Sequence, residues 1–168
     1  MVKIVLLMLL LVPITGFAQS SSLINQAQAF VSSLNIPTQQ INPRAFRFNN
    51  TQQGKTWVMF VFEREAVNQL LIYSVFPHAI PAAHRQTAME FITRANYGMS
   101  IGNFEMDLSD GEIRYKTSLD ARGVAINDTI LNVLLQTNAS IMFQYWEGFE
   151  GIRRGELNAI QAIQLTEG

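Results

Sequence analysis

Acids, glycines and aromatic residues come together most closely in the stretch NYGMSIGNFEMDLSDGEIRYKTSLD, residues 96–120. If this stretch is a strand at its centre, Glu105 and Asp107 point to the same side, with their carboxylates roughly 7 Å apart. Paired carboxylates are the groups with which glycosidases work, one of them as a general acid. Gly98 and Gly102 raise a second possibility, a glycine-rich loop that holds a phosphate.

The dipeptide Asp110–Gly111 predicts a β-hairpin in this stretch, because a two-residue type I′ turn needs positive φ angles. A turn centred there places Glu105 opposite Lys116 and Asp107 opposite Arg114. Bases across the strands would keep both carboxylates ionised, whereas a general acid needs a raised pKa. We therefore interpret the acids as a solvated sheet face and reject glycosidase chemistry here. The other face of the predicted hairpin carries the pairs Leu108/Ile113, Met106/Tyr115 and Phe104/Thr117.

The glycines are explained by local structure. A phosphate-binding loop requires the pattern GxxxxGK[ST] between a strand and a helix, and this stretch has no such pattern. We expect Gly98 to end a helix with a positive φ angle and Gly102 to form a tight turn into the strand.

No other set of residues predicts catalysis or metal binding. His78 and His84 are six residues apart, which does not place them on one helical face, and the motifs HExxH and GxSxG are missing. Cysteine is absent, which excludes thiol chemistry and cysteine-bound zinc. We expect no enzymatic activity, no cofactor and no metal. A hydrolase stays as a minor hypothesis, which predicts a histidine beside Ser or Asp in a cleft.

The N-terminus predicts export. After Lys3, residues 4–18 (IVLLMLLLVPITGFA) carry no charge, and their apolar core is too short to span a bilayer comfortably. We interpret residues 1–18 as a signal peptide cut after Ala18, with an uncleaved anchor as the alternative. Residues 19–168 then form a single domain, which we expect in the periplasm or secreted. The formal net charge of −1 disfavours a nucleic-acid partner.

The remaining sequence predicts an α+β domain. Its order is α-β-β-β-α-β-β-α, with a short helix after that, and we expect an antiparallel sheet of about five strands with helices packed on it. The residues TQQIN (38–42) are interpreted as a loop. Gly148 and Gly151 are expected to kink or end the long helix. The predicted helices cover residues 23–34, 82–96, 129–149 and 153–165, and the predicted strands outside the hairpin cover residues 44–50, 56–65 and 69–76.

The two central strands are apolar on both faces, which indicates that both faces are covered. Helices can cover one face, and the other requires a further helix, a partner chain or a ligand. Aromatic residues are common in the core and enriched at interfaces, so we also consider them as an interaction surface. The candidates on the strand and at the end of the long helix are Trp57, Phe60, Phe62, Tyr145, Trp146 and Phe149.

The segment FITRANYGMSIGNFEMDLSDGEIRYKTSL resembles the YbjN-type proteins, bacterial sensory transduction regulators, at Asn96, Gly102, Phe104, Asp110 and Gly111. The resemblance implies a fold like that of type III secretion chaperones, often dimeric, that binds proteins and carries no catalytic residues. The export signal departs from the many cytoplasmic relatives.

Together these observations predict an exported, non-enzymatic protein-interaction domain, chaperone-like or regulatory. We expect protein partners, which include a second copy of the chain, but no nucleic acid and no stable membrane insertion after signal cleavage. The alternative is a periplasmic carrier of a small apolar ligand or peptide, which predicts an apolar cavity between the sheet and residues 129–149.

Overall fold

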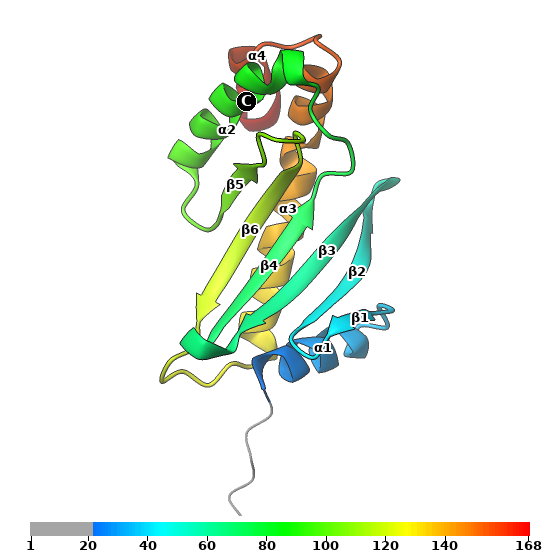
Figure 1. Cartoon of the computed structure of the whole chain (residues 1–168), viewed down its shortest axis with the longest axis vertical. Coiled ribbons are helices and arrows are strands. Elements are labelled where there is room, and N and C mark those ends of the chain that lie inside the picture. The colour runs from blue at the N-terminus through cyan, green and yellow to red at the C-terminus, as the bar shows by residue number, and fades with distance from the viewer. Residues whose placement is uncertain (1–21) are drawn as a thin grey trace, which may run out of the picture.

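The computed structural model describes residues 22–168, so the predicted signal peptide lies outside the described residues. Over this range the chain is an α+β domain with one antiparallel sheet of six strands, in the order β1-β2-β3-β4-β6-β5 (Figure 1). The strands are β1 (Gln39–Asn42), β2 (Ala45–Gln52), β3 (Lys55–Arg64), β4 (Gln69–Val75), β5 (Asn103–Met106) and β6 (Ile113–Asp120). The helices are α1 (Leu23–Ser33), α2 (Arg85–Gly98), α3 (Asp128–Arg153) and α4 (Ala159–Glu167).

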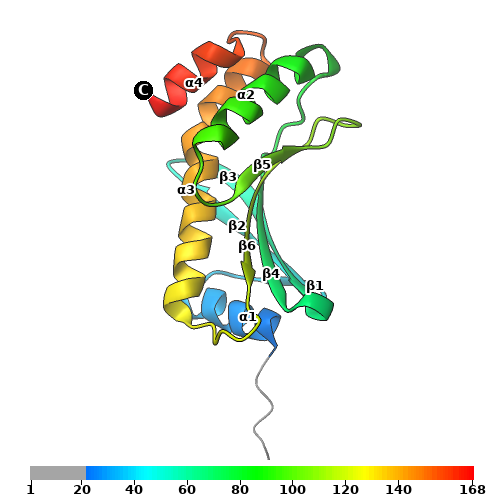
Figure 2. The same ribbon diagram turned by 90° about the vertical axis from the view of Figure 1, so that its left-hand side faces the viewer.

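All four helices lie on the same side of the sheet or beyond its end (Figure 2). Helix α3 runs along the sheet and contacts β4 and β6, while α1 contacts β3 and β4 near one end. Helices α2 and α4 pack together at the other end, with α4 against α3. We call the sheet surface that faces α3 the inner face and the opposite surface the open face.

Alternation along the central strands separates these two faces. In β3, Trp57, Met59 and Val61 are buried on the inner face, whereas Phe60 and Phe62 point to the open face and are only partly buried. β4 follows the same rule, with Leu70 and Ile72 buried on the inner face. The two strands lie inside the sheet as predicted, but among the described residues helices cover only the inner face, so the expectation that both faces are covered is met on one face.

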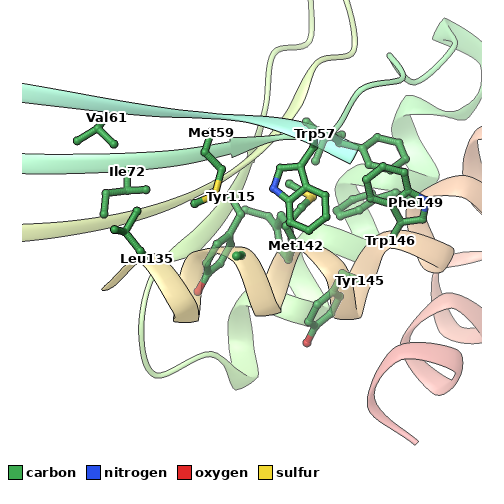
Figure 3. Close-up of a cluster of buried hydrophobic side chains, with 14 of the residues drawn as sticks. Trp57, Met59, Val61, Ile72, Tyr115, Leu135, Met142, Tyr145, Trp146 and Phe149 are labelled. Atoms are coloured by element: carbon green, nitrogen blue, oxygen red, sulfur yellow. The ribbon is translucent and has the colours of Figure 1, made fainter. Parts of the chain in front are cut away.

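Aromatic side chains of α3 fill the space above the inner face (Figure 3). Trp146 packs against Trp57 with 5.8 Å between the ring centroids, and Phe149 packs against Phe104 at 5.0 Å. Tyr145 also contacts Phe104, with 5.2 Å between the rings. These side chains are buried, and they join the long helix to the sheet.

A buried amide adds a polar contact between α3 and the sheet. Asn138 is fully buried, and its Nδ2 donates to the carbonyl oxygen of Ile72 at 3.0 Å and to Oγ1 of Thr117 at 3.1 Å. A polar group without a partner is costly in the interior, so these hydrogen bonds favour one position of α3 on the sheet.

Several predicted details are wrong. The TQQIN segment, expected as a loop, contains the edge strand β1, which raises the strand count to six. Gly98 belongs to α2 and has no positive φ angle, while Gly102 has a φ of +75° and forms the expected turn. Helix α3 continues through Gly148 and Gly151. A Cβ atom at Gly148 would lie 2.5 Å from the ring of Phe91, so this glycine permits close packing of α2 on α3.

The hairpin has a different turn from the predicted one. Asp110–Gly111 is not a two-residue type I′ turn; Phe104 pairs with Tyr115 and Glu105 with Arg114, a register two residues away from the prediction. A shift of two residues keeps each side chain on its predicted face, because strand side chains alternate with a period of two. The predicted faces therefore hold for the residues of β5 and β6, although the predicted pairs do not form. Leu108, predicted on the apolar face, lies in the turn and is exposed.

The wider loop has local and tertiary causes. The Asp107 carboxylate accepts hydrogen bonds from the backbone N–H and the hydroxyl of Ser109, at 2.8 and 2.6 Å, and so takes Asp107 out of the strand. Gly111 has a φ of +86°, and its carbonyl oxygen accepts the N–H of Ile80 at 2.9 Å. A Cβ atom at Gly111 would lie 2.2 Å from the carbonyl oxygen of Ile80.

Asn96 holds the edge strand β5 in place. Its side-chain Nδ2 donates to the carbonyl oxygen of Phe104 at 3.0 Å, and the N–H of Phe104 donates to its Oδ1 at 2.8 Å. The amide thereby satisfies the backbone of β5 as a neighbouring strand would. Gly102 is needed at the same corner, because a Cβ atom there would lie 2.5 Å from the Tyr115 hydroxyl.

Replacing Gly111 with Ala should destabilise the protein by about 3 kcal/mol, because both the positive φ and the contact with Ile80 oppose a side chain. Gly123→Ala is the matched control, since Gly123 has a φ of +73° but no atom within 4 Å of its Cβ position. We expect the control to lose about 1 kcal/mol. Urea unfolding measures both, and equal losses would show that the Ile80 contact contributes nothing.

Candidate functional site

The open face of β3 and β4 carries an apolar island that no helix covers among the described residues (Figure 2). Its six side chains form three cross-strand pairs, which are Phe62/Leu71, Phe60/Tyr73 and Val58/Val75. The rings of Phe60 and Phe62 are stacked, with 6.0 Å between their centroids, and Tyr73 meets Phe62 edge-on at 5.7 Å. We call this set the open-face island.

A hollow of about 630 Å³ lies over the island and the neighbouring part of β6 and β5. Arg114 forms one side of it and stacks on the Tyr73 ring, with its guanidinium carbon 4.7 Å from the ring centroid. Partly buried aromatic rings with an arginine beside them are the composition of protein-binding surfaces. The open face therefore has a wide, open hollow of a composition suited to binding a protein partner.

Glu105 balances the cations at this side of the island. Its carboxylate accepts from Nε of Arg114 at 2.8 Å and contacts Nζ of Lys116. Partial burial raises the pKa of Glu105, but the hydrogen bonds from Lys116, Arg114 and Asn103 outweigh it and leave the pKa below its usual value. A carboxylate held ionised in this way cannot serve as a general acid near neutral pH.

Asp107 has a different partner from the one predicted. The hydrogen bonds from Ser109 lower the pKa of Asp107, with Arg114 and Arg85 contributing through charge alone. Glu105 thus belongs to an ion cluster on the sheet, whereas Asp107 stabilises the turn of the hairpin. The sequence analysis rejects paired-carboxylate catalysis at these two acids, and their lowered pKa values give it no support.

The six aromatic candidates divide between the two faces. Phe60 and Phe62 lie on the open face and remain candidates. The other four are at most 7% exposed and form the core between the sheet and α3, so they are not a surface; they are Trp57, Tyr145, Trp146 and Phe149 (Figure 3). The two groups differ because β3 alternates between faces and the end of α3 points inward.

The sequence reasoning missed the partners of Phe60 and Phe62 on β4. Tyr73, Leu71 and Val75 complete the island, yet they were assigned only to a buried strand. The sequence does indicate these partners. The short connection at residues 65–68 predicts that β3 and β4 pair antiparallel, and this pairing places the apolar residues of β4 beside Phe60 and Phe62. The position of Arg114 and Lys116 beside these residues depends on the pairing of β6 with β4.

The histidines lie away from the open-face island. His78 contacts the carboxylate of Glu150, which is buried and also accepts from Nε and Nη2 of Arg153 at 3.1 and 2.9 Å. Within residues 22–168, no serine hydroxyl is hydrogen-bonded to His78 or His84. His78 thus lies beside Glu150, whereas the hydrolase hypothesis predicts a histidine beside Ser or Asp in a cleft.

The space in which the carrier hypothesis expects a cavity is occupied by side chains. Met142 and Phe149 of α3 are fully buried, and so are Ile72 and Tyr115 on the facing strands (Figure 3). An apolar ligand between the sheet and α3 would have to displace these groups.

The described residues contain neither a metal-binding cluster nor a membrane-spanning helix. No group of three or more His, Asp or Glu residues in this part of the chain is placed to hold a metal ion. No helix in residues 22–168 is both long enough and apolar enough to cross a membrane.

The match to a protein family covers both strands of the island. The model of the YbjN family, described as "Putative bacterial sensory transduction regulator", matches residues 50–150, which is more than half of the chain. The chain therefore belongs to the YbjN family, as its resemblance at Asn96, Gly102 and the hairpin predicts. No curated protein and no solved structure matches the chain.

A pair of substitutions on β3 tests whether the open face is free. Met59→Ser should lower the free energy of unfolding by about 3 kcal/mol, because Met59 is buried on the inner face. Phe60→Ser, one residue along, should cost only about 1 kcal/mol, since Phe60 is only partly buried. Urea unfolding gives both values. A loss at Phe60 as large as that at Met59 would show that the open face is covered in the isolated protein.

The lowered pKa of Glu105 predicts a pH dependence of stability. Its folded pKa lies below the unfolded one, so its contribution is complete above about pH 4.5 and is lost as the pH falls through the folded value. Glu105→Gln should therefore lose less stability than the wild type between about pH 6 and pH 3. Urea unfolding at both pH values measures the difference, and parallel losses would contradict the assignment.

Proposed function

We propose that this YbjN-family protein is an exported regulatory domain that binds a protein partner through the open-face island and catalyses no reaction. The observation that carries the proposal is the position of Phe60, Phe62 and Tyr73 on a sheet face without a helix over it. These side chains are partly buried and form a contiguous apolar patch, and the largest apolar patches on protein surfaces are often binding sites.

The features of the patch support a protein as the ligand. The hollow over the island is open and broad, whereas sites for small molecules enclose most of the ligand surface. Aromatic residues and arginine, which dominate the binding energy of protein interfaces, meet at Tyr73 and Arg114. A chaperone-like role would use the same face, with a transient partner in place of a permanent one.

Export is proposed from the sequence of residues 1–18, which lie outside the described residues. The absence of cysteine agrees with a domain that folds by packing alone and so does not depend on disulfide formation after export. Fractionation of the source bacterium, with the mass of the protein measured in the periplasmic and cytoplasmic fractions, tests this. Removal of residues 1–18 supports it, and an intact chain in the cytoplasm refutes it.

Binding through the island can be tested by affinity capture from a periplasmic extract, with mass spectrometry. We expect a partner that the wild type retains and that the double variant Phe60→Ser/Phe62→Ser loses. The matched control is Tyr97→Ser/Ile160→Ser, which removes two exposed apolar side chains from α2 and α4, 95% and 52% exposed. Capture that survives the first variant but not the control would place the binding site on the helices and refute the proposal.

A further inference from the structure

The chemistry of the partner can be read from the charges around the open-face island. In the middle row of the island, Phe60 and Tyr73 are paired across β3 and β4. Arg47 lies directly across from Phe60 on β2, and Lys116 lies directly across from Tyr73 on β6. The aromatic centre therefore has a cation on each side.

These cations are only partly neutralised within the protein. Arg47 donates its Nε to the neutral side chain of Gln39 at 2.9 Å, and Arg64 at the end of β3 forms no ion pair among the described residues. Lys116 shares the single carboxylate of Glu105 with Arg114. Among the described residues, Arg47 and Arg64 thus have no carboxylate partner, whereas Lys116 and Arg114 share the carboxylate of Glu105.

The acids near the face cancel this excess on one side only. Glu112 lies beside Arg114 at the hairpin end, and Asp120 at the far end is bonded to Arg122. Glu63 also borders the hollow, but its carboxylate accepts the backbone N–H of Leu23 at 3.1 Å and is thereby directed to α1. The excess of positive charge therefore lies on the side of Arg47 and Arg64, because Glu105 and Glu112 balance Lys116 and Arg114 on the other side.

This arrangement disfavours a second copy of the chain as the occupant. If two open faces stack with their strands aligned, the middle row of one copy covers the middle row of the other. Depending on the direction of the two-fold axis, Arg47 then faces either Lys116 or Arg47 of the second copy. Like charges opposed across an interface cost several kcal/mol in unfavourable cases, so the face selects against itself.

We propose that the open face binds a segment of another protein in which apolar side chains are flanked on one side by an acidic group. The apolar side chains would cover Phe60, Phe62 and Tyr73. The acidic group would pair with Arg47 or Arg64, the two cations beside the island without a carboxylate among the described residues. This inference rests on the proposed function and names the kind of partner that the same face takes.

The test is a selection of peptides from a displayed library of random 16-residue sequences. Wild-type protein is the target, and peptides that also bind the Phe60→Ser variant are removed. We expect the enriched peptides to have Asp or Glu on one side of Leu, Ile or aromatic residues. Their affinity should fall roughly tenfold in the Arg47→Glu variant, and it should weaken as NaCl rises from about 50 to 500 mM.

Arg94→Glu is the matched control, because it makes the same charge change on α2, where Arg94 pairs with Glu90. It should leave peptide binding unchanged. Enriched peptides that depend on Phe60 but carry neutral or basic flanks would refute this inference and leave the proposed function standing. If no peptide depends on Phe60, both fail. A dimer in light scattering that Phe60→Ser dissociates would identify a second copy as the occupant and refute the inference.

Discussion

Aromatic contacts between α3 and the inner face of the sheet hold the two layers of this protein together. Trp146 meets Trp57 and Phe149 meets Phe104, so one end of the long helix contacts both the centre and the edge of the sheet. Gly148 permits α2 to join the same cluster, because any side chain there would overlap Phe91. Within residues 22–168 the four helices lie on one side of the sheet or beyond its end, and the opposite face of β3 and β4 is apolar and has no helix over it.

This division of the sheet places the proposed binding face away from the part of the sequence that most suggests a site. The stretch around the hairpin combines acids and glycines because it must fix an edge strand, with Asn96 bonded to the backbone of Phe104 and Gly111 to that of Ile80. The residues shared with the YbjN family at this corner are therefore explained by architecture. The proposed binding face lies on the neighbouring strands, and the hairpin supplies only its charged border, Arg114 and Lys116.

The proposed binding face, the open-face island, agrees with the description of the family as a regulator. A regulator that binds proteins needs a surface that is stable without its partner, and here Met59 and its inner-face neighbours supply the stability. Phe60 and Phe62 are then free to serve recognition. Separate faces for stability and binding allow the binding residues to change without loss of the fold.

The sequence by itself determined most of the elements, though not the edge strand β1 or the end of α3, and the face on which the residues of β3 to β6 lie. Both depend on short-range patterns: apolar residues at helical spacing in α1 and α3, and alternation in β3 and in the hairpin strands. Only the tertiary structure decided the register of the hairpin, since the contact of Gly111 with Ile80 and the turn at Asp107 shift it by two residues. It also decided which aromatic residues are buried. Trp57 and Phe60 look alike in the sequence, and they differ because the helices pack on one face of the sheet and leave the other open.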